Sequence, residues 1–145
     1  MTVQGTPAGG LQAVGQIVPT NEVTFRKDLN GMEVAVELLS RHTPGGAVVD
    51  ENNHFVGFIS EFDVLRALEA GKDLTKLRAE DIMVKERISI TDSTSIKEAV
   101  KIMEEKRLLN LPVERDGKVA YTVTRHDLLR AWVGLGLGGE FRGED

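Results

Sequence analysis

Apolar residues recur along this chain with two periods, and the same order of periods occurs twice. Segments 21–25 and 86–90 alternate apolar and polar residues, which predicts two short strands. Each is followed by apolar residues at helical spacing, MEVAVELL at Met32–Leu39 and IKEAVKIM at Ile96–Met103. The chain therefore contains an internal repeat of about sixty residues, in two copies.

The repeat has one apparent offset at two anchor points. Ala35 pairs with Ala99, and Asp63 pairs with Asp127, each pair 64 positions apart. The stretches between these anchors match with small compensating changes in length. Each half alone is too short to bury a hydrophobic core that would keep it stably folded. We therefore expect the halves to share an interface between their sheets.

Both predicted first helices have a recognisable start. Asn30 and Glu33 have the spacing of an N-cap and its capping box, and so do Ser95 and Glu98. These pairs predict helices that begin just after Asn30 and Ser95.

Two further strands and a second helix follow in each half. Asp116-Gly117 predicts a tight hairpin, because both central residues of the favoured turn need positive φ, and Glu51–Asn53 is a looser equivalent. The final helices are followed by Gly71 and Gly134, which are stop signals. Each half is thus predicted to be strand, helix, strand, strand, helix.

Each final helix is predicted to start at a hydroxyl residue with an aspartate three positions later: Ser60 with Asp63, and Thr124 with Asp127. One interpretation is helix capping, since this pair satisfies free backbone N–H groups and suits the helix dipole. The other is ligand binding, in which the helix start holds a phosphate and the carboxylate accepts hydrogen bonds from sugar hydroxyls. The two are compatible, because the hydroxyl can turn from the cap to a bound oxygen.

The composition is that of an ordinary soluble globular domain and excludes several functions. The 145 residues are 41% hydrophobic and 28% charged, with no apolar run of membrane-spanning length and no export signal, so a cytoplasmic location is predicted. There is no cysteine, and His42, His54 and His126 lack metal-ligand spacing, so we expect no metal site. The net charge of −5 argues against nucleic-acid binding, which needs clustered Lys and Arg side chains.

Motifs for catalysis are missing. GLGLGG at Gly134–Gly139 matches the spacing of a dinucleotide-binding turn, yet it follows a helix, whereas that turn joins a strand to a helix. The sequence has no P-loop and no nucleophile elbow. We therefore predict that the protein is not an enzyme.

The order of these features resembles a tandem pair of CBS domains. AEDIMV at Ala79–Val84 leads the second copy, and LPV at Leu111–Val113 lies at the start of its hairpin. The resemblance runs from about Gln16 to Gly134 and implies an α/β fold of two pseudo-symmetric β-α-β-β-α repeats packed through their sheets. The implied division is an N-terminal arm at 1–15, which is either loose or an added strand, a first CBS domain at 16–78, a second at 79–134 and a flexible tail at 135–145.

The resemblance also implies a function. Such a module is regulatory and binds adenosine-containing compounds, namely AMP, ADP, ATP, NAD or S-adenosylmethionine, in clefts between the two repeats. It needs no obligatory cofactor, forms a homodimer and signals to a separate protein target.

The resemblance further implies which residues contact the ligand. Asp63 and Asp127 would bind the ribose, and Ser60 and Thr124 would lie near phosphate. Asn30 and Thr94, which the resemblance matches with each other before the first helices, would line the cleft. Leu109 and Asn110 would meet the adenine through their backbone, and the resemblance matches them with Gly45 and Gly46 in the first copy. The remaining implied contacts are Tyr121, Arg125 and His126.

The two copies differ beside the aspartate. Arg125 and His126 flank Asp127, so cationic donors can approach a phosphate there. The first copy has Glu61 and Phe62 at these positions, and a carboxylate repels a phosphate. We therefore predict that the Asp127 cleft binds an anionic nucleotide more tightly.

Other departures favour an alternative, a non-binding structural module for dimerisation or protein interaction with vestigial clefts. Tyr121 stands where the first copy has Gly57, and its ring either stacks on a base or fills the pocket. Asn110 replaces the basic residue that the family often has before LPV.

Overall fold

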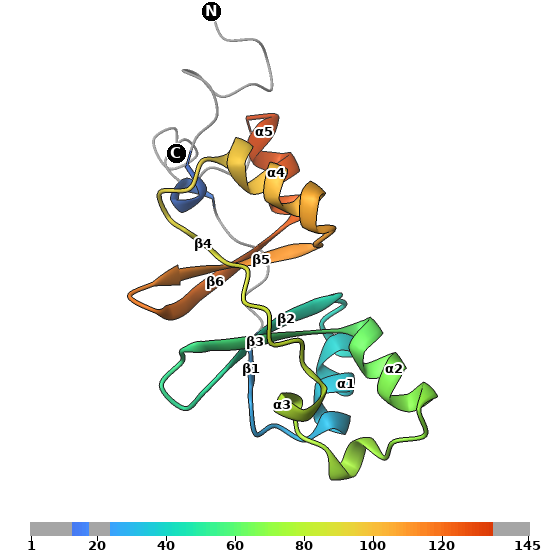
Figure 1. Cartoon of the computed structure of the whole chain (residues 1–145). Helices are drawn as coiled ribbons and strands as arrows, with labels where there is room; N and C mark the ends of the chain where they lie inside the picture. Colours follow the sequence, from blue (N-terminus) through green and yellow to red (C-terminus); the bar gives the residue numbers. More distant parts are fainter. Residues whose placement is uncertain (1–12, 18–23, 135–145) are drawn as a thin grey trace, which may run out of the picture. The chain divides into compact units, whose positions relative to one another are not determined.

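The computed structural model describes residues 13–17 and 24–134, which form two compact units (Figure 1). The first-repeat unit comprises 24–88 and 116–120, and the second-repeat unit comprises 13–17, 89–115 and 121–134. The predicted arm up to residue 12 and the predicted tail from residue 135 lie outside the described residues.

The first-repeat unit has the predicted strand, helix, strand, strand, helix order. Its sheet has the strand order β1-β2-β3, with β1 parallel and β3 antiparallel to β2. Helices α1 and α2 lie on one face of this sheet (Figure 1). The elements are β1 (Thr24–Arg26), α1 (Gly31–Ser40), β2 (Gly45–Val49), β3 (Phe55–Ser60), α2 (Glu61–Glu69), the 3-10 turn η2 (Leu74–Lys76) and α3 (Ala79–Ile82).

The second-repeat unit has the same order, so the predicted duplication is confirmed. Its sheet has the order β4-β5-β6, and β4 is parallel to β5. The second opening strand is shorter than predicted, since β4 is only two residues long. The elements are the 3-10 turn η1 (Val14–Gln16), β4 (Ile90–Thr91), α4 (Ile96–Lys106), β5 (Asn110–Arg115), β6 (Lys118–Thr124) and α5 (Arg125–Trp132).

The predicted N-caps of α1 and α4 are confirmed. Asn30 Oδ1 accepts from the Met32 N–H at 2.8 Å, and Ser95 Oγ accepts from the Glu98 N–H at 3.0 Å. The Asn30 bond is made to Met32, the second residue of α1, where the predicted capping box would use the third. Its amide nitrogen instead donates to the Thr75 carbonyl at 2.8 Å, so this cap also holds the loop after α2.

The caps correct the alignment of the repeats. Asn30 and Ser95 are 65 positions apart, not 64, and β2 and β5 keep this offset because the register pairs Phe25 with Val48 and Ile90 with Val113. The match of Ala35 with Ala99 was therefore wrong by one residue. The buried Ala99 corresponds to the buried Val34, and the offset returns to 64 only across the second, shorter hairpin turn.

The predicted turns and helix ends are confirmed by the backbone. Asp116 and Gly117 have φ of 54° and 78°, as the tight hairpin requires, and Asn53 has φ of 67° in the looser turn. Gly71 and Gly134 have φ of 79° and 85° just beyond α2 and α5, where a residue with a Cβ would be strained.

A short segment ahead of each repeat packs within the unit of the other repeat. Ala79 and Glu80 donate backbone hydrogen bonds to first-repeat carbonyls at 2.8 and 3.0 Å. Val14 and Gly15 donate to second-repeat carbonyls at 2.7 and 2.9 Å. Residues 13–17 are thus a 3-10 turn anchored to the second repeat, with one bridge between Ala13 and Ser95.

The hairpin tip at residues 116–120 completes the first-repeat unit. Val119 is buried in a cluster with Ala47, Val49 and Phe55. The Asn53 side chain donates to the Val119 carbonyl at 2.8 Å. The first-repeat unit therefore needs residues 116–120 from the second repeat, and the second-repeat unit needs residues 13–17 from the segment ahead of the first.

Candidate functional site

The start of α2 carries a complete capping box. The Ser60 N–H and the Ser60 hydroxyl both donate to Asp63 Oδ2, at 2.8 and 2.9 Å, and the Asp63 N–H donates to Ser60 Oγ at 3.3 Å. Asp63 is only 8% exposed. Its other oxygen, Oδ1, accepts from Arg66 Nη1 at 3.1 Å, so both carboxylate oxygens have partners within the helix.

The start of α5 repeats this cap with a different charge environment. The Thr124 N–H donates to Asp127 Oδ2 at 2.9 Å, and the Asp127 N–H donates to Thr124 Oγ1 at 3.1 Å. Asp127 is 1% exposed, while Arg125 and His126 beside it are exposed. The capping interpretation is thus confirmed for both copies, and it fixes each carboxylate at the first turn of its helix.

Each helix start lies against the first strand of its own hairpin. The Glu61 N–H donates to the Pro44 carbonyl at 2.9 Å, and the Arg125 N–H donates to the Leu109 carbonyl at 3.2 Å. Leu109 and Asn110 therefore correspond to Pro44 and Gly45, and the predicted correspondence with Gly45 and Gly46 was wrong by one residue.

Both glycines are buried in β2, and Gly45 has no room for a side chain. A Cβ added to Gly45 would lie 2.7 Å from the Ile59 carbonyl oxygen and 2.9 Å from the Phe58 ring. Gly45 pairs with Ser60 in the sheet, so this strand brings its backbone close to the α2 cap, and Gly46 is the next residue along it.

Two other predicted residues have local structural partners. Thr94 Oγ1 accepts from the Thr91 N–H at 3.1 Å, in the turn before α4. Asn30 is the cap of α1, and its counterpart is Ser95, so the predicted correspondence of Asn30 with Thr94 is corrected by one residue. Asn110 begins β5 and is buried.

Tyr121 is buried inside the second-repeat unit. Its hydroxyl donates to Asp92 Oδ1 at 2.8 Å and lies 3.4 Å from the Val14 carbonyl oxygen, while the Arg115 guanidinium lies 5.5 Å from the ring centroid. Burial and the Asp92 carboxylate raise the pKa of Tyr121, and the hydrogen bond from Arg115 lowers the pKa of Asp92. Tyr121 thus anchors residues 13–17 to the second repeat.

The corresponding position in the first repeat, Gly57, has no room for a side chain. A Cβ there would lie 2.5 Å from Met83 Sδ and 2.8 Å from the Val84 carbonyl oxygen. The segment ahead of the second repeat occupies this space. At the same position of the repeat, Gly57 leaves room for the segment that packs on it, whereas Tyr121 contacts residues 13–17 with its own side chain.

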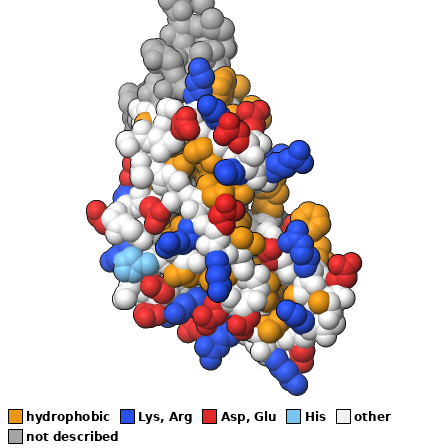
Figure 2. All heavy atoms as spheres, in the orientation of Figure 1, with side chains coloured by type: hydrophobic (Ala, Val, Ile, Leu, Met, Phe, Trp, Pro, Cys, Tyr) orange, Lys and Arg blue, Asp and Glu red, His pale blue; other side chains and the backbone are white. Residues whose placement is uncertain are grey.

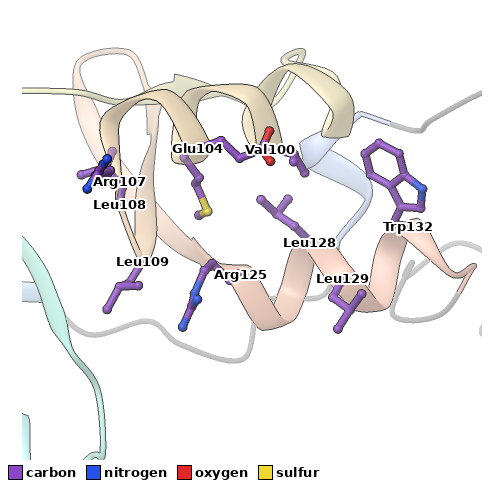
Figure 3. A pocket seen from close by; sticks show the side chains of 10 residues that line it. Val100, Glu104, Arg107, Leu108, Leu109, Arg125, Leu128, Leu129 and Trp132 are labelled. Atoms are coloured by element: carbon purple, nitrogen blue, oxygen red, sulfur yellow. The ribbon is translucent and has the colours of Figure 1, made fainter.

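Two cavities lie beside the helix starts. A small one of about 180 Å³ is lined by Asp63, Arg66, Ala67, Lys72, Leu77, Asp81 and Ile82. A larger one of about 660 Å³ lies between α4 and α5 (Figure 3), and Leu109 and Arg125 are the predicted site residues that line it. Its remaining lining residues are Val100, Met103, Glu104, Arg107, Leu108, Leu128, Leu129 and Trp132.

Sequence reasoning missed Thr122, in β6. It is 1% exposed, and its Oγ1 has no hydrogen-bond partner among the described residues. Because side chains alternate along a strand, Thr122 lies on the same face of β6 as Thr124, the cap of α5. That alternation was readable in the sequence, but the burial of Thr122 was not. A buried hydroxyl without a partner calls for an explanation, and a bound polar group is one.

The described residues, 13–17 and 24–134, contain neither a membrane-spanning helix nor a cluster of metal ligands. No helix there is long and apolar enough to cross a membrane. No group of three or more histidine, cysteine or acidic residues there could hold a metal ion.

These features define a class of protein: a duplicated α/β module in which each repeat ends in an acid-capped helix. The chain belongs to the CBS domain family, which matches residues 14–70 and 79–134.

Comparisons with individual proteins agree with this assignment. The chain is 28% identical to the uncharacterized protein MK0525 of Methanopyrus kandleri, over 81% of this chain and 61% of that protein, so it spans about three fifths of that relative. It is similar to CBSX2 solved in complex with AMP, with 25% identity, coverage of 83% and 95%, and a TM-score of 0.70. It is also similar to the CBS domain pair of MJ0100 solved with 5′-methylthioadenosine and S-adenosyl-L-methionine, with 25% identity, coverage of 82% and 98%, and a TM-score of 0.72.

Proposed function

We propose that this protein is a regulatory module that binds an adenosine-containing compound, such as AMP, ADP, ATP, NAD or S-adenosylmethionine. The observation that carries the proposal is the duplicated helix start, in which Asp63 and Asp127 are buried and held by their caps. The complexes of CBSX2 with AMP and of MJ0100 with S-adenosylmethionine support the ligand class.

The cap explains how the site would work. An ionised carboxylate only accepts hydrogen bonds, so it suits the two hydroxyls of a ribose. The N-cap hydroxyl of Ser60 or Thr124 turns from the helix to a phosphate oxygen, which the positive helix end also favours. The remaining residues proposed to surround the ligand are Asn30, Thr94, Gly45, Gly46, Leu109, Asn110 and Tyr121.

The proposed second-repeat site is the stronger one for an anionic ligand. Beside Asp127, neither Arg125 nor His126 has an ion-pair partner among the described residues, and both are exposed. Phosphate binding there gains charge-assisted hydrogen bonds, whereas Glu61 repels a phosphate at the first-repeat site.

Titration calorimetry with each of the five compounds tests the proposal. Asp127→Asn keeps an oxygen that can accept from the Thr124 N–H but loses the charge, so the affinity for the preferred ligand should fall by about tenfold or more. Asp63→Asn is the matched control at the other cap and should weaken binding less. Binding that is unchanged in both variants would refute the ribose role.

A second candidate function is a structural module for dimerisation or protein interaction whose clefts bind nothing. The observation that favours it is the complete satisfaction of the Asp63 cap by Ser60 and Arg66, which leaves the acid a purely structural role. Absence of heat with all five compounds would support it.

The remaining proposals concern the assembly, partner and location of the protein, and the absence of catalysis and of a cofactor. We propose a homodimer that signals to a separate protein target from the cytoplasm, without catalysis and without an obligatory cofactor. A phosphate-release assay with ATP tests the absence of catalysis, and sedimentation velocity tests the dimer.

A further inference from the structure

The cavity of about 660 Å³ between α4 and α5 has a wall made of one stripe from each helix. Each stripe consists of residues at positions i, i+3, i+4 and i+7, which lie on one face of a helix. All of these residues belong to the second-repeat unit. The stripes are Val100, Met103, Glu104 and the C-cap Arg107 on α4, and Arg125, Leu128, Leu129 and Trp132 on α5.

The two ends of this cavity differ in character. The Arg125 N–H donates to the Leu109 carbonyl at 3.2 Å, so the end of α4 lies beside the start of α5. Arg107 and Arg125 are therefore at one end of the cavity, and Trp132 is at the other end (Figure 3). Trp132 lies two turns of α5 beyond Arg125, which is about 10 Å along the helix.

The arginine end of the cavity favours an anion. Arg107 and Arg125 are exposed, and neither has an ion-pair partner among the described residues. Glu104 also lines the cavity, so its wall carries two cations and one carboxylate. A negative group is thus attracted by the arginines and repelled by Glu104, which lies one turn away from Arg107.

Most of the remaining wall is apolar and open to solvent. Leu129 and Trp132 are 64% and 38% exposed, while Met103 and Leu128 of the same wall are buried. In Figure 2, apolar side chains of this unit reach the surface among acidic and basic ones. Large apolar side chains around a hollow are typical of small-molecule sites, whose volumes are about 300–1,000 Å³.

We infer that this cavity binds a medium-chain fatty acid, which is an unbranched apolar chain with one terminal carboxylate. The chain lies along Leu128 and Leu129 and ends at Trp132, so a length of about 10 Å fits the distance between the two ends. The carboxylate accepts charge-assisted hydrogen bonds from Arg107 and Arg125. A nucleotide does not suit this wall, because its polar groups would be placed against apolar side chains.

This site is separate from the nucleotide sites proposed at the helix starts, although Arg125 belongs to both proposals. The tests therefore change Arg107 and Glu104, which are not among the residues proposed to bind the nucleotide. The inference does not depend on nucleotide binding, and it concerns the second-repeat unit alone.

Tryptophan fluorescence measures occupation of the cavity, because Trp132 lines it and is the only tryptophan in the sequence. The full chain is titrated with sodium decanoate below the concentration at which micelles form, and a saturable change in emission is expected. Butyrate has the carboxylate with a short chain, decanol has the chain without a charge, and decyltrimethylammonium has the chain with a positive charge. Each of the three should bind about tenfold more weakly or worse. Absence of a saturable change with decanoate, or equal affinity for decanol, overturns the inference.

Two variants with opposite expected effects test the charges. Arg107→Gln should weaken decanoate binding by about threefold or more, whereas Glu104→Gln should strengthen it, because a repelling carboxylate is removed. Lys106→Gln is the matched control, since Lys106 is exposed and does not line the cavity, and it should change the affinity less than either. The titrations are made in about 0.15 M salt, which screens charges that lie farther away than about 8 Å. Unchanged affinity in Arg107→Gln, or weaker binding in Glu104→Gln, contradicts the inference.

Two further measurements separate this inference from the other proposals. If a second copy of the chain fills the cavity, decanoate produces no saturable change at concentrations where sedimentation velocity shows a dimer, and the inference fails. Calorimetry with the preferred nucleotide should give wild-type affinity for Arg107→Gln and Glu104→Gln. A chain that binds decanoate as expected but no nucleotide refutes only the nucleotide proposal.

Discussion

The starts of α2 and α5 are each capped by two residues that are only three positions apart in the chain. Ser60 with Asp63 and Thr124 with Asp127 form the same cap, since the spacing alone brings hydroxyl, backbone N–H and carboxylate together. The sequence therefore predicted these caps. The burial of Thr122 and the contact of Tyr121 with Asp92 could not be predicted in this way, because both arise between segments that are distant in the chain.

Thr122 makes a direct prediction about stability. Its buried hydroxyl has no partner among the described residues, so Thr122→Val should raise the unfolding free energy of the ligand-free protein by about 1 kcal/mol. Thr124→Val removes the α5 cap and should lower it by about 1 kcal/mol, as a control on the same strand. Urea unfolding measures both, and a loss of stability in Thr122→Val would contradict the assignment of an orphan hydroxyl.

Among the secondary-structure elements, the segments ahead of the repeats make contacts that complete the packing of each unit. In the first-repeat unit, Met83 and Val84 lie over Gly57 of β3. Gly57→Ala should lower the unfolding free energy by about 1–3 kcal/mol, because the carbonyl oxygen of Val84 leaves no room for a Cβ. The double variant with Met83→Ala should recover only part of the loss, and an unperturbed single variant would show that this segment can move away.

In the second-repeat unit, we expect the contact of Asp92 with Tyr121 and Arg115 to depend on pH. The Arg115 guanidinium and the Tyr121 hydroxyl lower the pKa of Asp92 below its ordinary value of 3.8. A carboxyl with a lower pKa in the folded state stabilises the fold above its unfolded pKa, and this stability is lost as the pH falls through the folded pKa.

Asp92→Asn should therefore lower stability at neutral pH and reduce the loss of stability as the pH falls below 3.8, the ordinary pKa of this carboxyl. Urea unfolding across this range measures the difference from wild type, and the contributions of Asp50 and Asp73, whose pKa values are also lowered, cancel in that comparison. Parallel curves for the two proteins would contradict the proposed role of Asp92.

At the scale of the whole molecule, the exchange of segments makes the repeats interdependent. A fragment of residues 79–145 lacks Val14, which is fully buried in the second-repeat unit, and loses its anchor to Tyr121. A fragment of residues 1–88 lacks Val119, which is buried with Phe55. Each fragment should lack cooperative thermal unfolding by circular dichroism, whereas the full chain should show it, because about sixty to ninety residues with an incomplete core are marginal. A cooperative transition in either fragment would contradict this interdependence.

The duplicated β-α-β-β-α order, the turns at Asp116-Gly117 and Gly71, and the capped helix starts could all be predicted from the sequence, because each follows from periodicity and local backbone chemistry. The exchange of the segments ahead of the repeats, the burial of Thr122 and the cavity beside Arg125 became visible only in the folded chain. These features depend on which segments pack together across the chain, and short-range patterns of apolar and polar residues do not encode that choice.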